Sequence, residues 1–211
     1  MQIAVLLFDR FTALDAVGPY EVLGRLPGAR TVFVADQAGP VTTDTGSLAL
    51  CATATLDEVT HPDVLVVPGG PGQIARMTDT RLLDWLHAVD AGTTWTTSVC
   101  TGSLLLAAAG LLAGRRATSH WLALEQLPTF GALPTPERVV VDGKYVTAAG
   151  VSAGIDMALA LAGRIAGDAV AQLVQLGIEY DPRPPYSAGS PGTAPARLVA
   201  ALRANPERVL G

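Results

Sequence analysis

The sequence predicts an α/β fold in which a mostly parallel sheet carries helices on both faces and a small β-hairpin is added. Two observations support this fold class. Continuous apolar runs of strand length, such as residues 3–8 and 63–67, are typical of strands buried on both faces. Segments with helical character alternate with these runs, as in parallel strands joined by right-handed crossovers.

The first half of the chain alternates buried strands with helices and inserts one hairpin that turns at Gly46. The strand at 63–67 runs into a glycine-rich turn, PGGPG. The predicted elements in order are a strand at 3–8, a helix with Pro19 in its first turn, a strand at 31–35, the hairpin at 40–52, the strand at 63–67 and a helix at 75–90.

The second half continues the alternation and ends in a segment rich in Pro, Gly and Ser. A two-residue turn signal, Asp142-Gly143, marks a second hairpin. The predicted elements in order are a strand at 93–99, a helix at 104–112, a short strand at 114–118, a short helix at 120–127, the hairpin at 139–141 and 145–147, two helices over 152–179 broken near Gly163 or Gly167, a loop at 181–195 and a helix at 196–204.

Length and composition indicate a single globular domain over residues 1–211, with no internal repeat. Hydrophobic residues make up 49% of the chain and charged residues 16%, which excludes an intrinsically disordered chain. The net charge of −5 and the lack of basic runs disfavour nucleic acid as a partner. Two cysteines and three scattered histidines lack the spacing of a metal site, so we expect none.

The N-terminus has no basic region before its apolar run and is therefore predicted to be a strand and not a signal peptide. The apolar stretch at 104–112 is far shorter than the roughly 20 residues that a membrane span needs. We accordingly expect no membrane partner and a cytoplasmic, reducing location. In that compartment an isolated cysteine is reactive or buried and not disulfide-bonded.

Three segments that carry candidate catalytic residues follow predicted strands: Asp15, Gly69-Gly70 and Cys100. The carboxyl ends of parallel strands meet at one edge of a sheet, which is where such folds bind their ligands. The sequence therefore predicts an active site at this edge, built from these segments.

Cys100 stands between a β-branched strand and an Ala/Leu-rich helix, within Ser-Val-Cys-Thr-Gly-Ser. A nucleophile at such a turn sits on a strained backbone, and the small residues Gly102 and Ser103 let the helix approach closely. We expect the N–H groups and dipole of this helix to lower the thiol pKa. The alternative, a buried structural cysteine, has about equal weight from position alone. Cys51 lies in an alternating strand and is interpreted as structural.

Each remaining candidate has a structural alternative. Asp15 is either a proton donor and acceptor beside the thiol or a simple helix cap. Gly69 and Gly70 offer either oxyanion-stabilising N–H groups, with Gly70 the expected donor, or only a tight turn. His120 is either a base or substrate-binding group or a packing histidine, and Thr101 either bonds substrate or water or begins a helix.

At these residues the chain resembles the ThiJ/PfpI superfamily, which has a class I glutamine amidotransferase-like, flavodoxin-like three-layer fold. Four separated segments are similar to its isonitrile hydratase branch: LDAVGPYEVL, SVCTGSLLLAAAGLLAGRRATSHW, GVSAGIDMALAL and EYDPRPPYSAGSPGTAP.

The resemblance implies hydration of an isonitrile to an N-substituted formamide, with Cys100 essential and with Asp15 and Thr101 in supporting roles. It also implies a homodimer and no metal or organic cofactor. Protease-like members of the superfamily carry a His after the cysteine, whereas this chain has Thr101, which makes peptidase activity doubtful. The chain also shows no helix-turn-helix extension, which disfavours the DNA-binding regulators that share these segments.

The mechanism we expect is attack of the Cys100 thiolate on the isonitrile carbon, with Asp15 delivering the proton. Direct attack by water with Cys100 only polarising the substrate is the alternative order. A glyoxalase-like or other small-electrophile hydrolase, and a cysteine-based redox or ligand sensor, are the alternative functions. Substrate-pocket lining is expected from residues 180–192 and Trp121.

Overall fold

Seven strands form the central sheet of the computed structural model, which describes residues 1–207. They are β1 (Gln2–Leu6), β2 (Arg30–Ala35), β5 (Ala54–Thr55), β6 (Val64–Val67), β7 (Trp95–Val99), β10 (Val139–Asp142) and β11 (Tyr145–Ala148). The sheet has the order β10-β11-β7-β6-β1-β2-β5, and every neighbouring pair is parallel except β10 with β11. The predicted α/β, flavodoxin-like fold with a mostly parallel sheet is confirmed. The expected domain runs to residue 211, and its last residues, 208–211, lie outside the described part.

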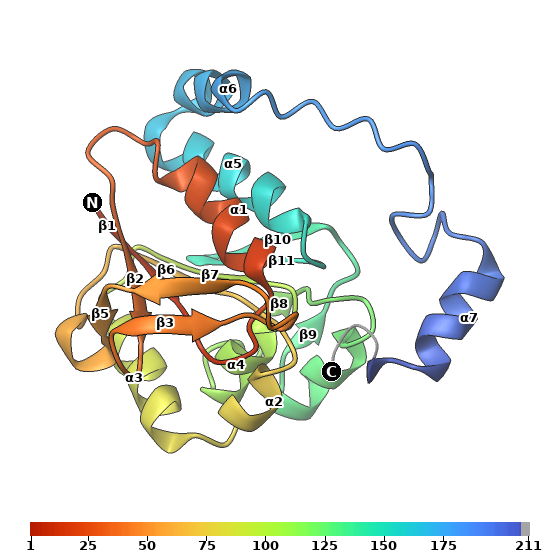
Figure 1. Ribbon diagram of the computed structural model, residues 1–211, viewed down its shortest axis with the longest axis horizontal. Helices are drawn as coiled ribbons and strands as arrows, with labels where there is room; N and C mark the ends of the chain where they lie inside the picture. The colour runs from red at the N-terminus through yellow and green to blue at the C-terminus, as the bar shows by residue number, and fades with distance from the viewer. Residues whose placement is uncertain (208–211) are drawn as a thin grey trace.

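Helices cover both faces of this sheet (Figure 1). One face carries α1 (Ala13–Leu23) and α5 (Ala153–Ala166), with α6 (Asp168–Gly177) packed on α5. The opposite face carries α3 (Thr80–Asp90) and α4 (Gly102–Ala108), with the short helix α2 (Gln73–Arg76) against α4. An arm then leads from α6 to α7 (Ala196–Ala204), which stands at the side of the molecule (Figure 1).

The smaller elements lie around the sheet. The predicted first hairpin is present as β3 (Gly39–Thr42) and β4 (Ala49–Ala52), which pair antiparallel. The other small elements are η1 (Leu56–Glu58), β8 (Arg116–Ala117), η2 (Leu124–Phe130) and β9 (Leu133–Pro134). Within residues 1–207 no helix combines the length and the apolar character that crossing a bilayer requires.

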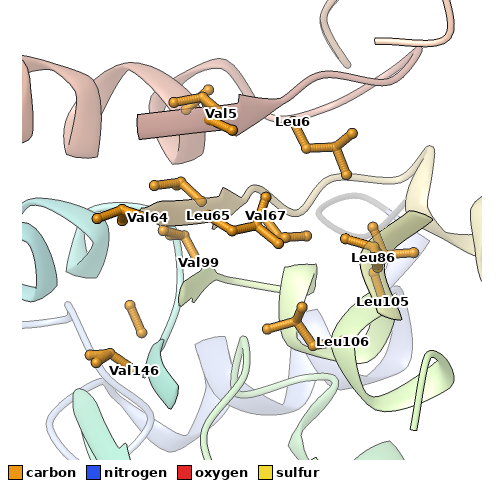
Figure 2. Packing of buried hydrophobic residues seen from close by; sticks show 14 of the residues in the cluster. Val5, Leu6, Val64, Leu65, Val67, Leu86, Val99, Leu105, Leu106 and Val146 are labelled. Carbon is orange, nitrogen blue, oxygen red and sulfur yellow. The ribbon is translucent and has the colours of Figure 1, made fainter. Parts of the chain in front are cut away.

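The core explains why the apolar runs become strands. Val5, Leu65 and Val99 lie on adjacent strands and are fully buried, because helices remove both faces of the sheet from water (Figure 2). From the α3 and α4 side, Leu86 and Leu105 complete the same cluster. The register of the sheet brings the ends of β1, β6 and β7 to one edge, because Val5 pairs with Val66 and Val67 with Ser98.

Three predicted elements differ from the structure. The helix expected over 75–90 is two helices, because the Asp79 carboxylate accepts the N–H of Leu82 and starts α3 anew. Pro19 lies in the interior of α1 and not in its first turn, since the helix already begins at Ala13. The helix expected over 120–127 is a 3₁₀ helix, η2, that begins only at Leu124.

The predicted helix break and final helix agree with the structure, and the second predicted hairpin is present with a shifted loop. The long helical region breaks at Gly167, whose φ of 87° suits glycine, and the final helix is α7 as expected. The second hairpin is present, with Asp142 paired to Tyr145, so that its loop is Gly143-Lys144 and not Asp142-Gly143.

The cap at Asp79 can be tested directly. We expect Asp79→Ala to lower the free energy of unfolding by about 1 kcal/mol, because the first turn of α3 loses its side-chain acceptor. Asp79→Asn retains an acceptor oxygen and is expected to lose much less. Urea titrations of the three proteins measure the difference; equal losses for both variants would mean that the ion pair with Arg76 matters more than the cap.

Candidate active site

Cys100 occupies the sharp turn between β7 and α4, as the sequence predicts. Its φ is 57°, a left-handed conformation that is uncommon for a residue with a side chain. The turn is held on both sides: the Cys100 N–H donates to the carbonyl oxygens of Ala148 and Ala149, and the Cys100 carbonyl accepts hydroxyl hydrogen bonds from Ser103 and Ser119. These contacts offset a backbone strain of about 1–2 kcal/mol and fix the sulfur in place.

The start of α4 packs directly on the end of β6. A Cβ added to Gly102 would lie 2.1 Å from the carbonyl oxygen of Val67, so only glycine fits there. The predicted close approach of this helix is therefore present at Gly102.

Asp15 lies in the first turn of α1 and is fully buried, but it is not the cap of that helix. Its Oδ2 accepts the N–H of Gly69 at 2.9 Å. Among residues 1–207 its Oδ1 has no hydrogen-bond partner, although the Cys100 thiol is near enough for each group to shift the pKa of the other. Asp15, Gly69 and Cys100 therefore lie together at one edge of the sheet, as predicted.

Burial controls the protonation of both groups. It raises the pKa of Asp15 from its ordinary 3.8 to about 7, although the hydrogen bond from the Gly69 N–H and the nearby Cys100 thiol lower it. Burial also raises the pKa of the Cys100 thiol well above its usual range, and the charge of Asp15 raises it further. The expected lowering of the thiol pKa is therefore wrong, because the N–H groups of Val151 and Thr101 offset only part of the desolvation.

The two glycines of the Pro68-Gly69-Gly70 turn donate hydrogen bonds to the side chains of Asp15 and Thr101. The Gly69 N–H is used by Asp15, and the Gly70 N–H donates to Thr101 Oγ1 at 3.0 Å. Gly70 has a φ of 128°, which directs its N–H in this way. The structure therefore does not place the Gly70 N–H as a free oxyanion donor. It leaves the hydroxyl proton of Thr101 to be donated to a ligand.

His120 lies at the edge of the site as a neutral imidazole. Burial lowers its pKa to about 4, which argues against a general base at neutral pH. Its Nδ1 accepts the N–H of Leu122 at 3.3 Å, so its proton resides on Nε2, which faces Gly150. A hydrogen-bond donor to substrate is the role this geometry permits.

A family model described as the DJ-1/PfpI family matches residues 1–164. The chain belongs to this family. It is 48% identical over 199 residues to the isonitrile hydratase of Pseudomonas putida, an alignment that covers 94% of this chain and 87% of the relative. An HTH-type transcriptional regulator of Pseudomonas aeruginosa is 32% identical over 75% of this chain, but this alignment covers only 48% of the regulator.

Solved structures show the same family fold. The crystal structure of a ThiJ/PfpI family protein from Pseudomonas syringae superposes with a TM-score of 0.95 at 42% identity, covering 99% of this chain and 87% of that one. Drosophila melanogaster DJ-1beta superposes with a TM-score of 0.75 at 24% identity, which shows the fold alone. That alignment covers 84% of this chain and 97% of the DJ-1beta chain.

Three neighbours of this DJ-1/PfpI site were not singled out from the sequence. Val151 directs its N–H to the Cys100 sulfur, Ser119 holds the Cys100 carbonyl, and the charge of Asp44 contributes to the raised pKa of Asp15. Val151 follows the end of β11, the strand next to β7, and so was discoverable only once the strand order was known. In the described part of the chain, no three His, Cys, Asp or Glu side chains gather as a metal site.

The requirement for glycine at position 69 gives a sharp prediction. A Cβ there would lie 2.5 Å from the Thr101 nitrogen and 3.0 Å from Asp15 Oδ2, so Gly69→Ala must displace both supporting residues. We expect kcat/KM to fall by about 100-fold and the free energy of unfolding by about 1–3 kcal/mol. Gly177→Ala, which meets no atom within 4 Å, is the matched control; equal kcat/KM values for the two variants would contradict the positioning role.

The buried carboxyl predicts a dependence of stability on pH. Because the native state keeps a proton on Asp15 up to a pKa of about 7 that the unfolded chain loses near 3.8, stability falls as pH rises through this window. The difference corresponds to at most about 4 kcal/mol.

Asp15→Asn should remove this slope and raise the free energy of unfolding at pH 8 by about 2–4 kcal/mol, while activity is lost. Urea titrations between pH 4 and 8 measure it. The exposed Asp57→Asn is the control and should keep the original slope; an unchanged slope in Asp15→Asn would show that this carboxyl is already ionised in the native state.

Proposed function

We propose that the protein hydrates an isonitrile, R–NC, to an N-substituted formamide, with Cys100 as nucleophile. The observation that carries the proposal is the buried pair of the Cys100 thiol and the Asp15 carboxyl, whose pKa of about 7 lets it take up and release a proton near neutral pH. The 48% identity to the isonitrile hydratase of Pseudomonas putida supports the choice of reaction within the family.

The first step moves one proton from the Cys100 thiol through Asp15 to the substrate. The raised thiol pKa keeps the sulfur protonated at rest, so the Asp15 carboxylate accepts the thiol proton as sulfur attacks the isonitrile carbon. Asp15 then delivers that proton to the same carbon. A carbon–sulfur bond and a carbon–hydrogen bond form, and the product is a thioimidate, Cys–S–CH=N–R.

The second step consumes water. Asp15, again ionised, takes a proton from a water that the Thr101 hydroxyl orients, the water oxygen adds to the thioimidate carbon, and Asp15 passes that proton to nitrogen. The carbon–sulfur bond then breaks as the new hydroxyl becomes the formyl oxygen, its proton passes through Asp15 to the sulfur, and R–NH–CHO leaves. The N–H groups of Val151 and Thr101 face the sulfur and favour its anionic form as it departs.

These steps balance with water as the sole co-reactant, so the proposal includes no metal or organic cofactor. A small-molecule substrate, a homodimer and a cytoplasmic location complete the proposal, together with a single domain over residues 1–211. The family supports these expectations by analogy.

The second cysteine of the chain, Cys51, provides a control for the role of Cys100. We expect Cys100→Ala to lose about 1000-fold or more of the turnover of cyclohexyl isocyanide, whereas Cys51→Ala, which changes the exposed cysteine, keeps full activity. Mass analysis of protein quenched during turnover should find the substrate mass on the peptide that contains Cys100.

A productive Cys100→Ala protein would overturn the covalent mechanism and favour direct attack by water. Turnover of methylglyoxal without action on isonitriles would overturn the proposed reaction in favour of a glyoxalase-like one.

A further inference from the structure

A cavity of about 540 Å³ opens beside the site on the side of α7. Its lining contains His120 and two residues that contact Cys100: the Ser119 hydroxyl bonds the Cys100 carbonyl, and the Val151 N–H faces the Cys100 sulfur. Cys100 itself is not part of the lining, so the cavity adjoins the residues that hold Cys100 in place. The expected lining is present in part, through Trp121 and residues 189–191.

The C-terminal arm and α7 form one part of the cavity lining, and the body of the protein forms the rest. Pro191 and Arg203 come from the arm and α7, while Trp121 and Leu124 come from the body of the protein. The Arg203 guanidinium stands over the Trp121 ring at 5.9 Å from its centroid. Although α7 contributes no buried side chain, it brings a planar cation to the face of an indole.

Size and lining chemistry indicate what the cavity accepts. Pockets of about 300–1,000 Å³ enclose ligands of drug size, so a methyl or other small alkyl group would leave most of this space unfilled. The indole face of Trp121 and the guanidinium plane of Arg203 both favour planar, electron-rich groups through stacking. The other charged lining residues are Glu125, Glu137 and Arg138. Of these, Glu137 is paired with Arg116 and Arg138 with Asp156.

We propose that this cavity is the subsite for the R group and that the substrates are isonitriles with a bulky aromatic R group, selected by Trp121 and Arg203. This inference rests on the proposed function and deepens it. The reacting carbon is held at Cys100, and the aromatic group extends the stack that Trp121 and Arg203 form. Arg203 and Trp121 therefore set specificity and take no part in the proton transfers.

The test is the ratio of kcat/KM for 2-naphthyl isocyanide to that for methyl isocyanide. We expect the unaltered protein to favour the naphthyl compound and Arg203→Ala to lower the ratio about 10-fold. Arg197→Ala removes the same type of side chain from the same helix, outside the cavity lining, and should leave the ratio within 2-fold. Trp121→Leu, which keeps an apolar side chain, should lower the ratio by a similar factor.

A second readout does not depend on turnover. Binding of the product analogue N-(2-naphthyl)formamide, measured by calorimetry, should weaken about 10-fold in Arg203→Ala and remain unchanged in Arg197→Ala.

The outcomes separate the two proposals. If methyl isocyanide is hydrated but both ratio and binding are unchanged in Arg203→Ala and Trp121→Leu, the subsite is wrong and the function stands. If no isonitrile is hydrated by the unaltered protein, the proposed function is wrong and the substrate class with it.

Discussion

The site depends on a carboxyl group that is buried away from water. Asp15 is fully buried on α1, with one oxygen bonded to the Gly69 N–H and the other without a hydrogen-bond partner among residues 1–207. Removing a carboxylate from water costs free energy, and the protein meets much of that cost by keeping the group protonated up to near neutral pH. The sheet supplies this arrangement, because β1, β6 and β7 end together and bring three loops to one place.

A thiol with a raised pKa needs a base more than a thiol with a lowered pKa does. In many cysteine enzymes a neighbouring cation produces a resting thiolate. Here burial keeps the sulfur protonated, and in the proposed mechanism the adjoining carboxylate accepts its proton during attack. That mechanism then delivers the same proton to carbon, so the pair suits a reaction in which sulfur and hydrogen add to one atom.

Much of the site could be predicted from the sequence, because strand ends in a parallel sheet converge whatever the details of packing. Asp15, Gly69-Gly70 and Cys100 were found in this way, and the structure brings them together. The sign of the thiol pKa shift could not be predicted, because it depends on how deeply the fold buries the sulfur and on the charge of Asp15, which is remote in sequence. The same reason applies to Gly70, whose N–H direction follows from a φ of 128° that no residue pattern reveals. The break before α3 was missed because the cap at Asp79 interrupts an otherwise continuous helical pattern.

The arm before α7 has a thermodynamic consequence. Residues 181–193 are all exposed, so α7 is held near the cavity mainly by covalent connection and by contacts such as that of Arg203 with Trp121. A tether of this length presents α7 to its docking place at an effective concentration of the order of millimolar. At such a local concentration, one contact worth about 1 kcal/mol would keep α7 docked only a small fraction of the time, so docking needs further contacts. A filled cavity adds contacts to the docked form alone, so occupancy and docking of α7 reinforce one another.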